Sequence, residues 1–386
     1  MNLDTEFQDI RPYRDHEFRA VMDNLLNSSL ADLLISTVFP GRPVEQIKSQ
    51  LKSINTIKDF QEQVIYKAMK LVMKSTSTGV TTSGIENLRH GENYLFISNH
   101  RDIILDPSLI NTFIFEQGFE IAEVAIGDNL LEKPWVKDLA RLNRSFIVKR
   151  NLSVRELINA SQRLSAYIQA TLLERKHSVW IAQREGRAKD GNDITQPGVL
   201  NMLGLSAKGS LKDHFTALNI LPVSISYELD PCDVDKVRSL YALKFFGGYT
   251  KEKNEDNLAM RKGIMGNKGR IHVHFGKPIG DQIEALPDDM HKNDMIQQIG
   301  NMIDAQVIGN YKLQKSNRIA YDVLMNKKDG LENFYSKEDK NQFIKDIEKK
   351  IATMAGDPIE LSSIFYEMYA RPYINKMELE KKSGSK

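Results

Sequence analysis

Hydrophobic residues follow one pattern at the two ends of the chain and another in the middle. From residue 3 to about residue 81, apolar positions recur at spacings of three and four, as in the stretch 57–72, and this periodicity is typical of amphipathic helices. The same spacing returns from about residue 283 onward. The pattern therefore predicts three regions, namely an N-terminal helical region at 1–83, a central region at 84–282 and a C-terminal helical region at 283–386.

Short apolar runs that alternate with helical stretches fill the central region. This alternation is typical of an α/β fold with a mixed, substantially parallel sheet flanked by helices. Ser153 and Glu156 have the spacing of a capping box, which predicts that a helix begins there and continues to Leu173. The predicted strands are 94–98, 120–126, 145–149, 178–182, 220–227 and 270–275.

Composition and charge narrow the class of protein. Hydrophobic residues make up 41% of the chain and charged residues 27%, which indicates a globular fold. The 53 basic and 51 acidic residues nearly cancel, so any attraction to phosphate or anionic lipid must come from local clusters. The single cysteine, Cys232, excludes an intramolecular disulfide framework and fits a reducing compartment.

The chain shows neither a signal peptide at its first residues nor an apolar run of the ~18 residues that a membrane-spanning helix needs. We therefore expect a cytoplasmic protein or a peripheral membrane protein.

A histidine and two acids follow the first predicted strand. Neutral imidazole, with a pKa of about 6.5, can take a proton from a hydroxyl, and a carboxylate on its other ring nitrogen fixes the tautomer and stabilises the imidazolium. His100 is the candidate base, and Asp102 and Asp106 are the candidate carboxylates. Ligands gather at the carboxyl ends of strands in open α/β sheets, which favours this position. Asp102 has a second interpretation, because it could cap a helix that begins near Leu105.

Three later strands also end in polar residues. Lys149 and Arg150 close one strand, and the polar and glycine-containing stretch 183–191 follows another. The apolar stretch 221–228 ends in the polar pair Tyr227 and Glu228. Arginine donates two parallel hydrogen bonds to phosphate and lysine adds a point charge, so these clusters indicate a phosphorylated substrate. Individually they could be solvated strand ends or surface ion pairs of little energetic value.

Taken in order, these segments resemble the four sequence blocks of the glycerolipid acyltransferase superfamily. The first block, Asn-His-x-Ser-x-x-Asp, is matched at 99–101 and 105–107. An apolar strand that ends in Arg corresponds to 146–150, and Glu-Gly-x-Arg-Ser followed by Gly corresponds to 185–191. The fourth block, an apolar Pro-Val-x-Ile strand, is matched at 222–225. The resemblance covers about 200 central residues, and its specificity lies in the set of blocks.

Two of the blocks depart from the family pattern. Family members place the acid five residues after the histidine, where this chain has Leu105, so one inserted residue assigns the orienting role to Asp106. Asp102, at the family's Ser position, is the alternative. The third block is one residue short after its glycine, which leaves open whether Arg187 or Lys189 faces the phosphate.

The resemblance implies a mechanism without a metal or a cofactor. His100 would remove the proton from an acceptor hydroxyl as that oxygen attacks the thioester of acyl-CoA or acyl carrier protein, and Asp106 would hold the imidazole. Cations would bind the acceptor phosphate, Glu185 would position a hydroxyl or a cation, and Gly186 would let the backbone approach the substrate. The residues that the resemblance assigns to the phosphate site are Lys149, Arg150, Glu185, Gly186, Arg187 and Lys189.

The partners implied by the resemblance are the acyl donor, a glycerophosphate acceptor and a membrane surface, without nucleic acid. 1-Acylglycerol-3-phosphate is the first choice of acceptor, glycerol-3-phosphate the second, and a lyso-aminolipid the third. The protein would serve phospholipid biosynthesis as a cytoplasmic protein peripheral to the inner face of the membrane. Two segments could contact lipid, 67–74 with lysines flanking apolar residues and 241–249 with aromatic residues around a lysine, although either could instead pack onto the core.

Three other classes of function compete with this interpretation. A hydrolase that uses Ser98 or Ser108 would need a Gly-x-Ser-x-Gly elbow, which the sequence lacks. A metal site at His100 and Asp106 would need a second histidine or a close set of ligands nearby. A non-catalytic lipid-binding protein could keep the same fold with an idle site, and a turnover assay separates it from an enzyme.

Overall fold

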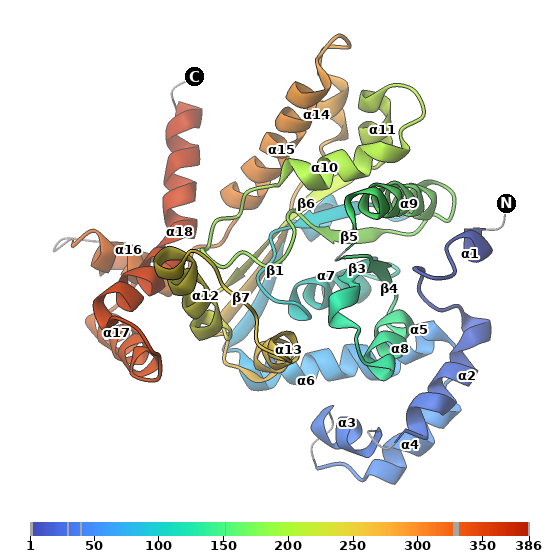
Figure 1. Ribbon diagram of the computed structural model, residues 1–386, viewed down its shortest axis with the longest axis horizontal. Coiled ribbons are helices and arrows are strands. Elements are labelled where there is room, and N and C mark those ends of the chain that lie inside the picture. The colour runs from blue at the N-terminus through green and yellow to red at the C-terminus, as the bar shows by residue number, and fades with distance from the viewer. Residues whose placement is uncertain (1–2, 29–30, 39–40, 151, 327–331, 385–386) are drawn as a thin grey trace.

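A seven-stranded sheet with helices on both faces forms the centre of the molecule (Figure 1). The computed structural model describes residues 3–28, 31–38, 41–150, 152–326 and 332–384. The strand order is β1-β7-β6-β2-β5-β3-β4. The strands are β1 (Gly79–Ser83), β2 (Leu95–Ser98), β3 (Glu123–Gly127), β4 (Ser145–Val148), β5 (Val179–Ala182), β6 (Ile220–Tyr227) and β7 (Arg270–Phe275). The mixed, mostly parallel α/β fold that the sequence predicts is confirmed.

Five of the strands, β6, β2, β5, β3 and β4, are parallel, and their common end is called the carboxyl edge below. Strand β7 runs antiparallel to β6, and Ile271 near its start pairs with Tyr227 at the end of β6. The chain therefore leaves the sheet and re-enters it at the carboxyl edge. The intervening helices α12 (Asp233–Phe246) and α13 (Glu255–Met265) lie at that edge, where His100 also follows β2.

Side chains of the strands alternate between two apolar layers. In β2, Leu95 and Ile97 belong to the core on one face of the sheet, whereas Phe96 belongs to the core on the other. This is the period of two expected for a strand that is buried on both faces. Helices α9 (Val154–Leu173), α10 (Pro197–Leu203), α11 (Leu211–Ala217), α14 (Gly280–Glu284) and α15 (Lys292–Gly309) cover the first face, and α6 (Tyr66–Thr76) and α7 (Leu105–Glu116) cover the second (Figure 1).

Two smaller clusters of helices flank the sheet, each with its own apolar core. The N-terminal cluster packs against α8, and the C-terminal cluster packs against α12. The N-terminal helices and α8 are α1 (Leu3–Glu6), α2 (Asp15–Leu26), α3 (Ala31–Val38), α4 (Val44–Ser53), α5 (Ile57–Phe60), the π-helix η1 (Gln61–Ile65) and α8 (Pro134–Leu142). The C-terminal helices are α16 (Lys315–Leu324), α17 (Lys337–Ile351) and α18 (Pro358–Gly384). Short 3-10 turns are η2 (Ile85–Asn87), η3 (Asp128–Leu130), η4 (Gly204–Ser206) and η5 (Glu332–Phe334).

The structure differs from the sequence-based expectation at several ends. Strand β1, Gly79–Ser83, pairs with β7 although the pattern places 79–83 in the N-terminal helical region. The charged sequence of 378–386 predicts a frayed end, but helix α18 continues to Gly384. The capping box of Ser153 and Glu156 is confirmed, since both of its hydrogen bonds form at the start of α9. In the described ranges, no helix combines the length and the apolar character that crossing a membrane requires.

Candidate active site

His100 stands two residues beyond the end of β2, at the carboxyl edge. The preceding Asn99 accepts a hydrogen bond from the backbone N–H of Ile225 at 2.8 Å and donates to its carbonyl at 2.9 Å. This side chain therefore continues the pairing of β2 with β6 for one more step, which fixes the backbone that carries His100.

Asp106, in the first turn of α7, holds the ring of His100. Its Oδ2 lies 2.8 Å from Nδ1 of His100 and also accepts the backbone N–H groups of Arg101 at 2.6 Å and Asp102 at 2.9 Å. Its Oδ1 accepts the hydroxyl of Tyr227 at 2.8 Å. A carboxylate can only accept, so Nδ1 of the imidazole is the donor and the neutral ring carries its lone pair on Nε2.

The Nε2 side of His100 faces outward. The side chain is 14% exposed, and no hydrogen bond to Nε2 forms within the described part of the chain. Trp180 lies edge-on to the ring at 5.7 Å between centroids, and its indole N–H donates to Ser98 at 3.0 Å. Nε2 is therefore available to a hydroxyl that enters from solvent, which is the position a general base needs.

Asp102 caps α7 and makes no hydrogen bond to His100. Its Oδ1 accepts the backbone N–H groups of Ile104 at 2.9 Å and Leu105 at 2.8 Å. Burial, followed by the charge of Asp106, raises the pKa of Asp102. Of the two interpretations open for this residue, the geometry matches the helix cap, and the carboxylate in contact with His100 is Asp106.

Arg150 and Glu185 meet at the carboxyl edge, although 35 residues separate them. The guanidinium of Arg150 forms an ion pair with the carboxylate of Glu185, and the backbone N–H of Arg150 donates to Asp128 at 3.1 Å. Both side chains reach solvent, since Arg150 is half-buried and Glu185 is exposed. The loops after β4 and β5 thus bring two of the predicted phosphate-site residues together.

The loop of the third block lies against the backbone of His100. The N–H of Ala188 donates to the carbonyl of His100 at 2.8 Å. Gly186 has φ +69°, a left-handed conformation that favours glycine, and the space beside its Cα is open. Arg187 is half-buried, and its positive charge opposes the rise in the pKa of Asp102. The loop next to His100 therefore contains an accessible stretch of backbone at Gly186 and a cation, Arg187.

Lys189, the last cation of the third block, turns toward α12. Its Nζ lies 2.5 Å from the hydroxyl of Ser239 and 5.2 Å from the ring centre of Tyr249. Burial, followed by the charge of Lys251, lowers the pKa of Lys189. Of Arg187 and Lys189, the lysine is therefore the one engaged with the α12–α13 segment.

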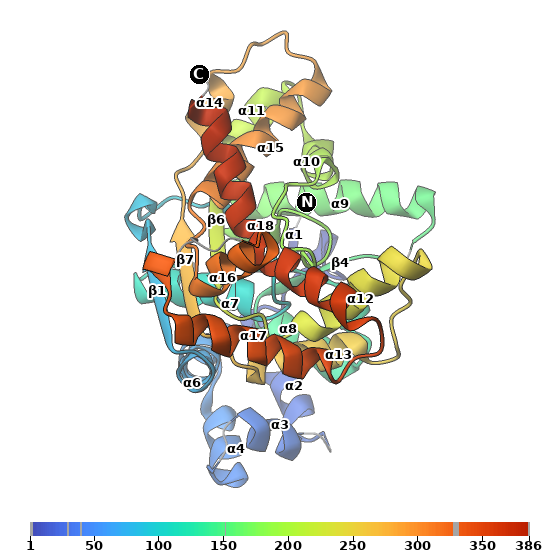
Figure 2. The same cartoon turned by 90° about the vertical axis from the view of Figure 1, so that its left-hand side faces the viewer.

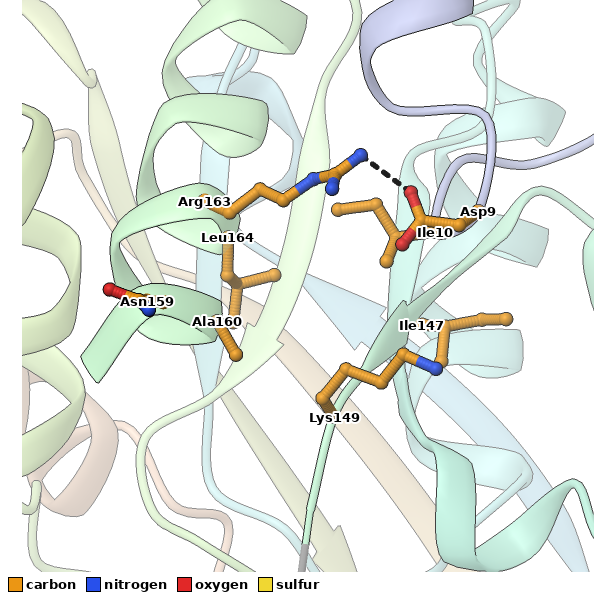
Figure 3. A pocket seen from close by; sticks show the side chains of 8 residues that line it. All are labelled: Asp9, Ile10, Ile147, Lys149, Asn159, Ala160, Arg163 and Leu164. Atoms are coloured by element: carbon orange, nitrogen blue, oxygen red, sulfur yellow. Dashed lines mark hydrogen bonds and ion pairs between the residues drawn. The ribbon is translucent and has the colours of Figure 1, made fainter. Parts of the chain in front are cut away.

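Lys149 lies in a groove that none of the other predicted site residues lines (Figure 3). The groove has a volume of about 220 Å³ and runs between α9 and the N-terminal segment. Its walls are Asp9, Ile10, Ile147, Lys149, Asn159, Ala160, Arg163 and Leu164. Lys149 Nζ also lies 4.0 Å from Oδ2 of Asp128, the acid whose Oδ1 accepts the backbone N–H of Arg150. The groove therefore includes Lys149 but not the ion pair of Arg150 with Glu185.

Residues to which the sequence assigned no role in holding the histidine complete its support. Besides Tyr227, a buried ion pair joins Arg101 to Asp193 at 2.5 Å, and Lys236 donates to the carbonyl of Arg101 at 2.9 Å. The polar end of the predicted strand 220–227 was the one available signal for Tyr227. Among the described residues, no group of three or more His, Cys, Asp or Glu side chains is placed to hold a metal ion.

Comparison with known proteins gives consistent results. A family model described as Acyltransferase matches residues 79–226, which include His100, Asp106 and the loops after β4 and β5. The dihydroxyacetone phosphate acyltransferase of Mus musculus is 24% identical over 270 residues, which are 68% of this chain and 37% of that protein. The enzyme of the same name from Homo sapiens is 25% identical over 207 residues, which are 52% of this chain and 28% of that protein. The chain thus spans about a third of the length of these curated relatives.

Among solved structures, the chain is similar to the 1-acyl-sn-glycerophosphate (LPA) acyltransferase of Thermotoga maritima. The TM-score is 0.36 at 12% identity, and the match covers 74% of this chain and 91% of that one.

Proposed function

Since the chain belongs, through its domain at residues 79–226, to the glycerolipid acyltransferase superfamily, we propose that it transfers a fatty acyl chain to the hydroxyl of a glycerophosphate acceptor. The acyl donor is acyl-CoA or acyl carrier protein. The observation that carries the proposal is the contact of His100 with Asp106, which leaves Nε2 exposed at the carboxyl edge.

His100 acts as the general base. Its Nε2 takes the hydroxyl proton as the acceptor oxygen attacks the carbonyl carbon of the thioester. The resulting tetrahedral intermediate collapses, the carbon–sulfur bond breaks, and the imidazolium returns the proton to the leaving thiolate. Asp106 keeps Nδ1 protonated and stabilises the imidazolium between these two steps.

The acceptor phosphate binds beside the loop of the third block. Arg150 and Arg187 supply the positive charge, and Glu185 holds Arg150 in place until the phosphate enters. Gly186 supports this assignment, because the open space beside its Cα allows a ligand to approach the backbone. Lys149 and Lys189 add positive charge near the phosphate without contacting it, because Lys149 lies beside Asp128 and Lys189 contacts Ser239.

1-Acylglycerol-3-phosphate is the proposed acceptor, with phospholipid biosynthesis as the role. A second candidate, dihydroxyacetone phosphate, is favoured by the names of the two curated relatives and offers the same pair of a hydroxyl and a phosphate. Glycerol-3-phosphate shares this chemistry, and a lyso-aminolipid is the remaining alternative. Because a lysophospholipid lies in the bilayer, we further propose that the protein works at the cytoplasmic face of a membrane as a peripheral protein.

The test is turnover with a panel of acceptors. Purified protein is incubated with acyl-CoA or acyl carrier protein and each of the four acceptors in turn, and the acylated product is quantified. We expect transfer to one or more glycerophosphates and its loss in His100→Ala. His16→Ala, an exposed histidine on α2, is the matched control and should keep the wild-type rate. Full turnover in His100→Ala would refute the mechanism, and no transfer to any acceptor would refute the function.

A further inference from the structure

Large apolar side chains are exposed on α9 and on the consecutive helices α12 and α13, which are distant from α9 in sequence. Phe246 and Leu243 project from the end of α12, and Leu258 projects from α13. At the start of α9, Val154, Leu157 and Ile158 are exposed at helical spacings of three and four. Val154 is 78% exposed and Phe246 is 77% exposed. These six residues are called the apolar rim below.

The fold places both parts of the apolar rim at the carboxyl edge. Helix α9 follows β4, so its first turns begin where the parallel strands end. The α12–α13 segment leaves the sheet at Tyr227 and returns opposite it, at the same edge. Figure 2 shows the free end of α9 and the α12–α13 segment on the same side of the molecule, at the right. The helices that carry the apolar rim therefore lie at the same edge of the sheet as His100.

Direct contacts join the α12–α13 segment to the site. Lys189 reaches Ser239 on α12 at 2.5 Å. On α13, Gly263 packs so closely on the active-site loop that a Cβ there would lie 2.0 Å from Oδ2 of Asp102. Isolated apolar side chains on a surface need no explanation, but a group of them around a site entrance indicates an interaction surface.

The charge of the α12–α13 segment fits an anionic surface. From the start of α12 to the end of α13, residues 233–265 contain seven Lys and Arg and five Asp and Glu, a small positive excess. Lys253 and Arg261 in this segment, and Arg155 on α9, form no ion pair with any residue that the structure describes. Exposed aromatic and aliphatic side chains with unpaired cations beside them are typical of surfaces that lie on anionic lipid.

Helix α6, which contains the other lipid-contact segment, 67–74, uses its apolar side for packing. Met69 and Met73 are buried in the core on the face of the sheet that α6 and α7 cover, and Met69 is 8% exposed. Leu71, at 49%, is the large apolar side chain of this segment that reaches solvent. The packing interpretation therefore accounts for 67–74, whereas the aromatic residues of 241–249 include the exposed Phe246.

We propose that the apolar rim docks the protein onto an anionic lipid bilayer, with the carboxyl edge facing the membrane. The rim residues enter the interface, and Arg155, Lys253 and Arg261 contact lipid phosphates around them. A membrane-embedded acceptor then reaches His100 without crossing water. This inference rests on the proposed function for the acceptor, but the docking itself is independent of turnover.

Vesicle flotation tests the docking surface. The probes are phosphatidylcholine vesicles with and without phosphatidylglycerol, and the variants are Leu243→Ser/Phe246→Ser and Val154→Ser/Ile158→Ser. Leu71→Ser is the matched control, because it removes an exposed leucine from the alternative segment. Wild type and Leu71→Ser should float with the anionic vesicles, and each double variant should bind about 100-fold more weakly, given the transfer free energy of two such side chains. Equal flotation of all variants, or none by wild type, would overturn the proposal.

Two further measurements separate this inference from its alternatives. On a short-chain, monomeric acceptor in solution the double variants should turn over like wild type, whereas on a vesicle-embedded acceptor they should be slower. Vesicle binding without turnover on any acceptor would refute the proposed function and leave the docking surface standing. A wild-type dimer that the double variants convert to a monomer, without flotation, would identify the rim as a contact between two copies and overturn the proposal.

Discussion

Asp106→Asn separates the charge of the orienting carboxylate from its hydrogen bonds. Asn has nearly the same shape, and one orientation of its amide preserves the four contacts. The amide oxygen in the place of Oδ2 accepts from Nδ1 of His100 and from the backbone N–H groups of Arg101 and Asp102. The amide NH₂ in the place of Oδ1 donates to the hydroxyl oxygen of Tyr227, which changes from donor to acceptor. The substitution therefore removes the negative charge and retains the tautomer of the histidine.

The loss of that charge sets the size of the effect. Asp106 Oδ2 lies 2.8 Å from Nδ1, so the centres of the two charged groups are about 4 Å apart. Two unit charges at this distance attract by about 4 kcal/mol at an effective dielectric constant of about 20. The attraction exists in the transition state, where the imidazole is protonated, and is absent while the ring is neutral. Since ~1.4 kcal/mol is a factor of ten in rate, we expect kcat to fall by about 10³ with little change in the KM of the acceptor.

Asp102→Asn is the matched control. Asn caps a helix about as well as Asp, so Oδ1 can still accept from Ile104 and Leu105. Burial raises the pKa of Asp102 and so disfavours its charge, and for this reason we expect the neutral side chain to lose little. Initial rates over a range of acceptor concentrations, with thermal unfolding to check the fold, should give a kcat within about threefold of wild type. An active Asp106→Asn, or an equal loss in Asp102→Asn, would refute the assignment of the dyad.

Three further substitutions test other parts of the site and the fold. Tyr227→Phe removes the hydrogen-bond donor to Asp106 and leaves a buried acceptor unpaired, so kcat should fall about tenfold while the KM of the acceptor stays unchanged. An unchanged kcat would exclude a positioning role for Tyr227. Arg150→Gln should raise the KM of the acceptor about tenfold or more while the KM of the acyl donor stays constant. A change confined to the KM of the donor would contradict the assignment of Arg150 to the phosphate site. Burial raises the pKa of Asp304 from 3.8 to about 6, so the folded protein binds this proton more tightly than the unfolded chain does. The free energy of unfolding should therefore fall as the pH rises from about 4 to about 6, by up to about 3 kcal/mol. Asp304→Asn can still accept from Thr195, so urea unfolding at pH 4 and pH 7.5 should show this decrease in wild type and little of it in the variant, and an equal decrease in both would contradict the explanation.

Six strands could be predicted because each is a short apolar run with polar residues at its ends. Strand β1, Gly79–Ser83, has no such signal, since Val80 is its one large apolar residue. Its hydroxyls pair instead with the neighbouring strand, as Thr81 lies 2.8 Å from Nδ1 of His272 and Ser83 lies 2.9 Å from Nε2. The partners are about 190 positions away, so a local pattern could not reveal this edge of the sheet.

The same distinction applies to the site. His100 and Asp106 stand in one short segment, and the start of α7 determines their separation, so their spacing was readable from the sequence. The supporting contacts join residues that are far apart, 121 positions for Tyr227 to Asp106 and 92 for Arg101 to Asp193. The ion pair of Arg150 with Glu185 likewise joins two loops that are 35 positions apart, so the order of residues does not specify it.

The C-terminal helices also support the active-site loop, through a chain of buried polar groups. Lys236 on α12 donates to the carbonyl of Arg101 and pairs with Asp230. The hydroxyl of Tyr369 on α18 accepts the backbone N–H of Asp230 at 3.0 Å and donates to Asp233 at 2.7 Å. Leaving such buried groups unpaired costs about 1–3 kcal/mol each, so these contacts restrict the position of the loop.

Tyr369→Phe tests this coupling between α18 and the site. The variant loses both hydrogen bonds of the hydroxyl, so we expect lower thermal stability together with a several-fold decrease in kcat, measured at a temperature where the variant is folded. Tyr373→Phe, on the same helix, is the control and should retain the wild-type kcat. If Tyr369→Phe lost stability but kept full kcat, α18 would stabilise the fold without positioning His100. A decrease in kcat confined to Tyr369→Phe means instead that the C-terminal helices are part of the scaffold on which the histidine is held.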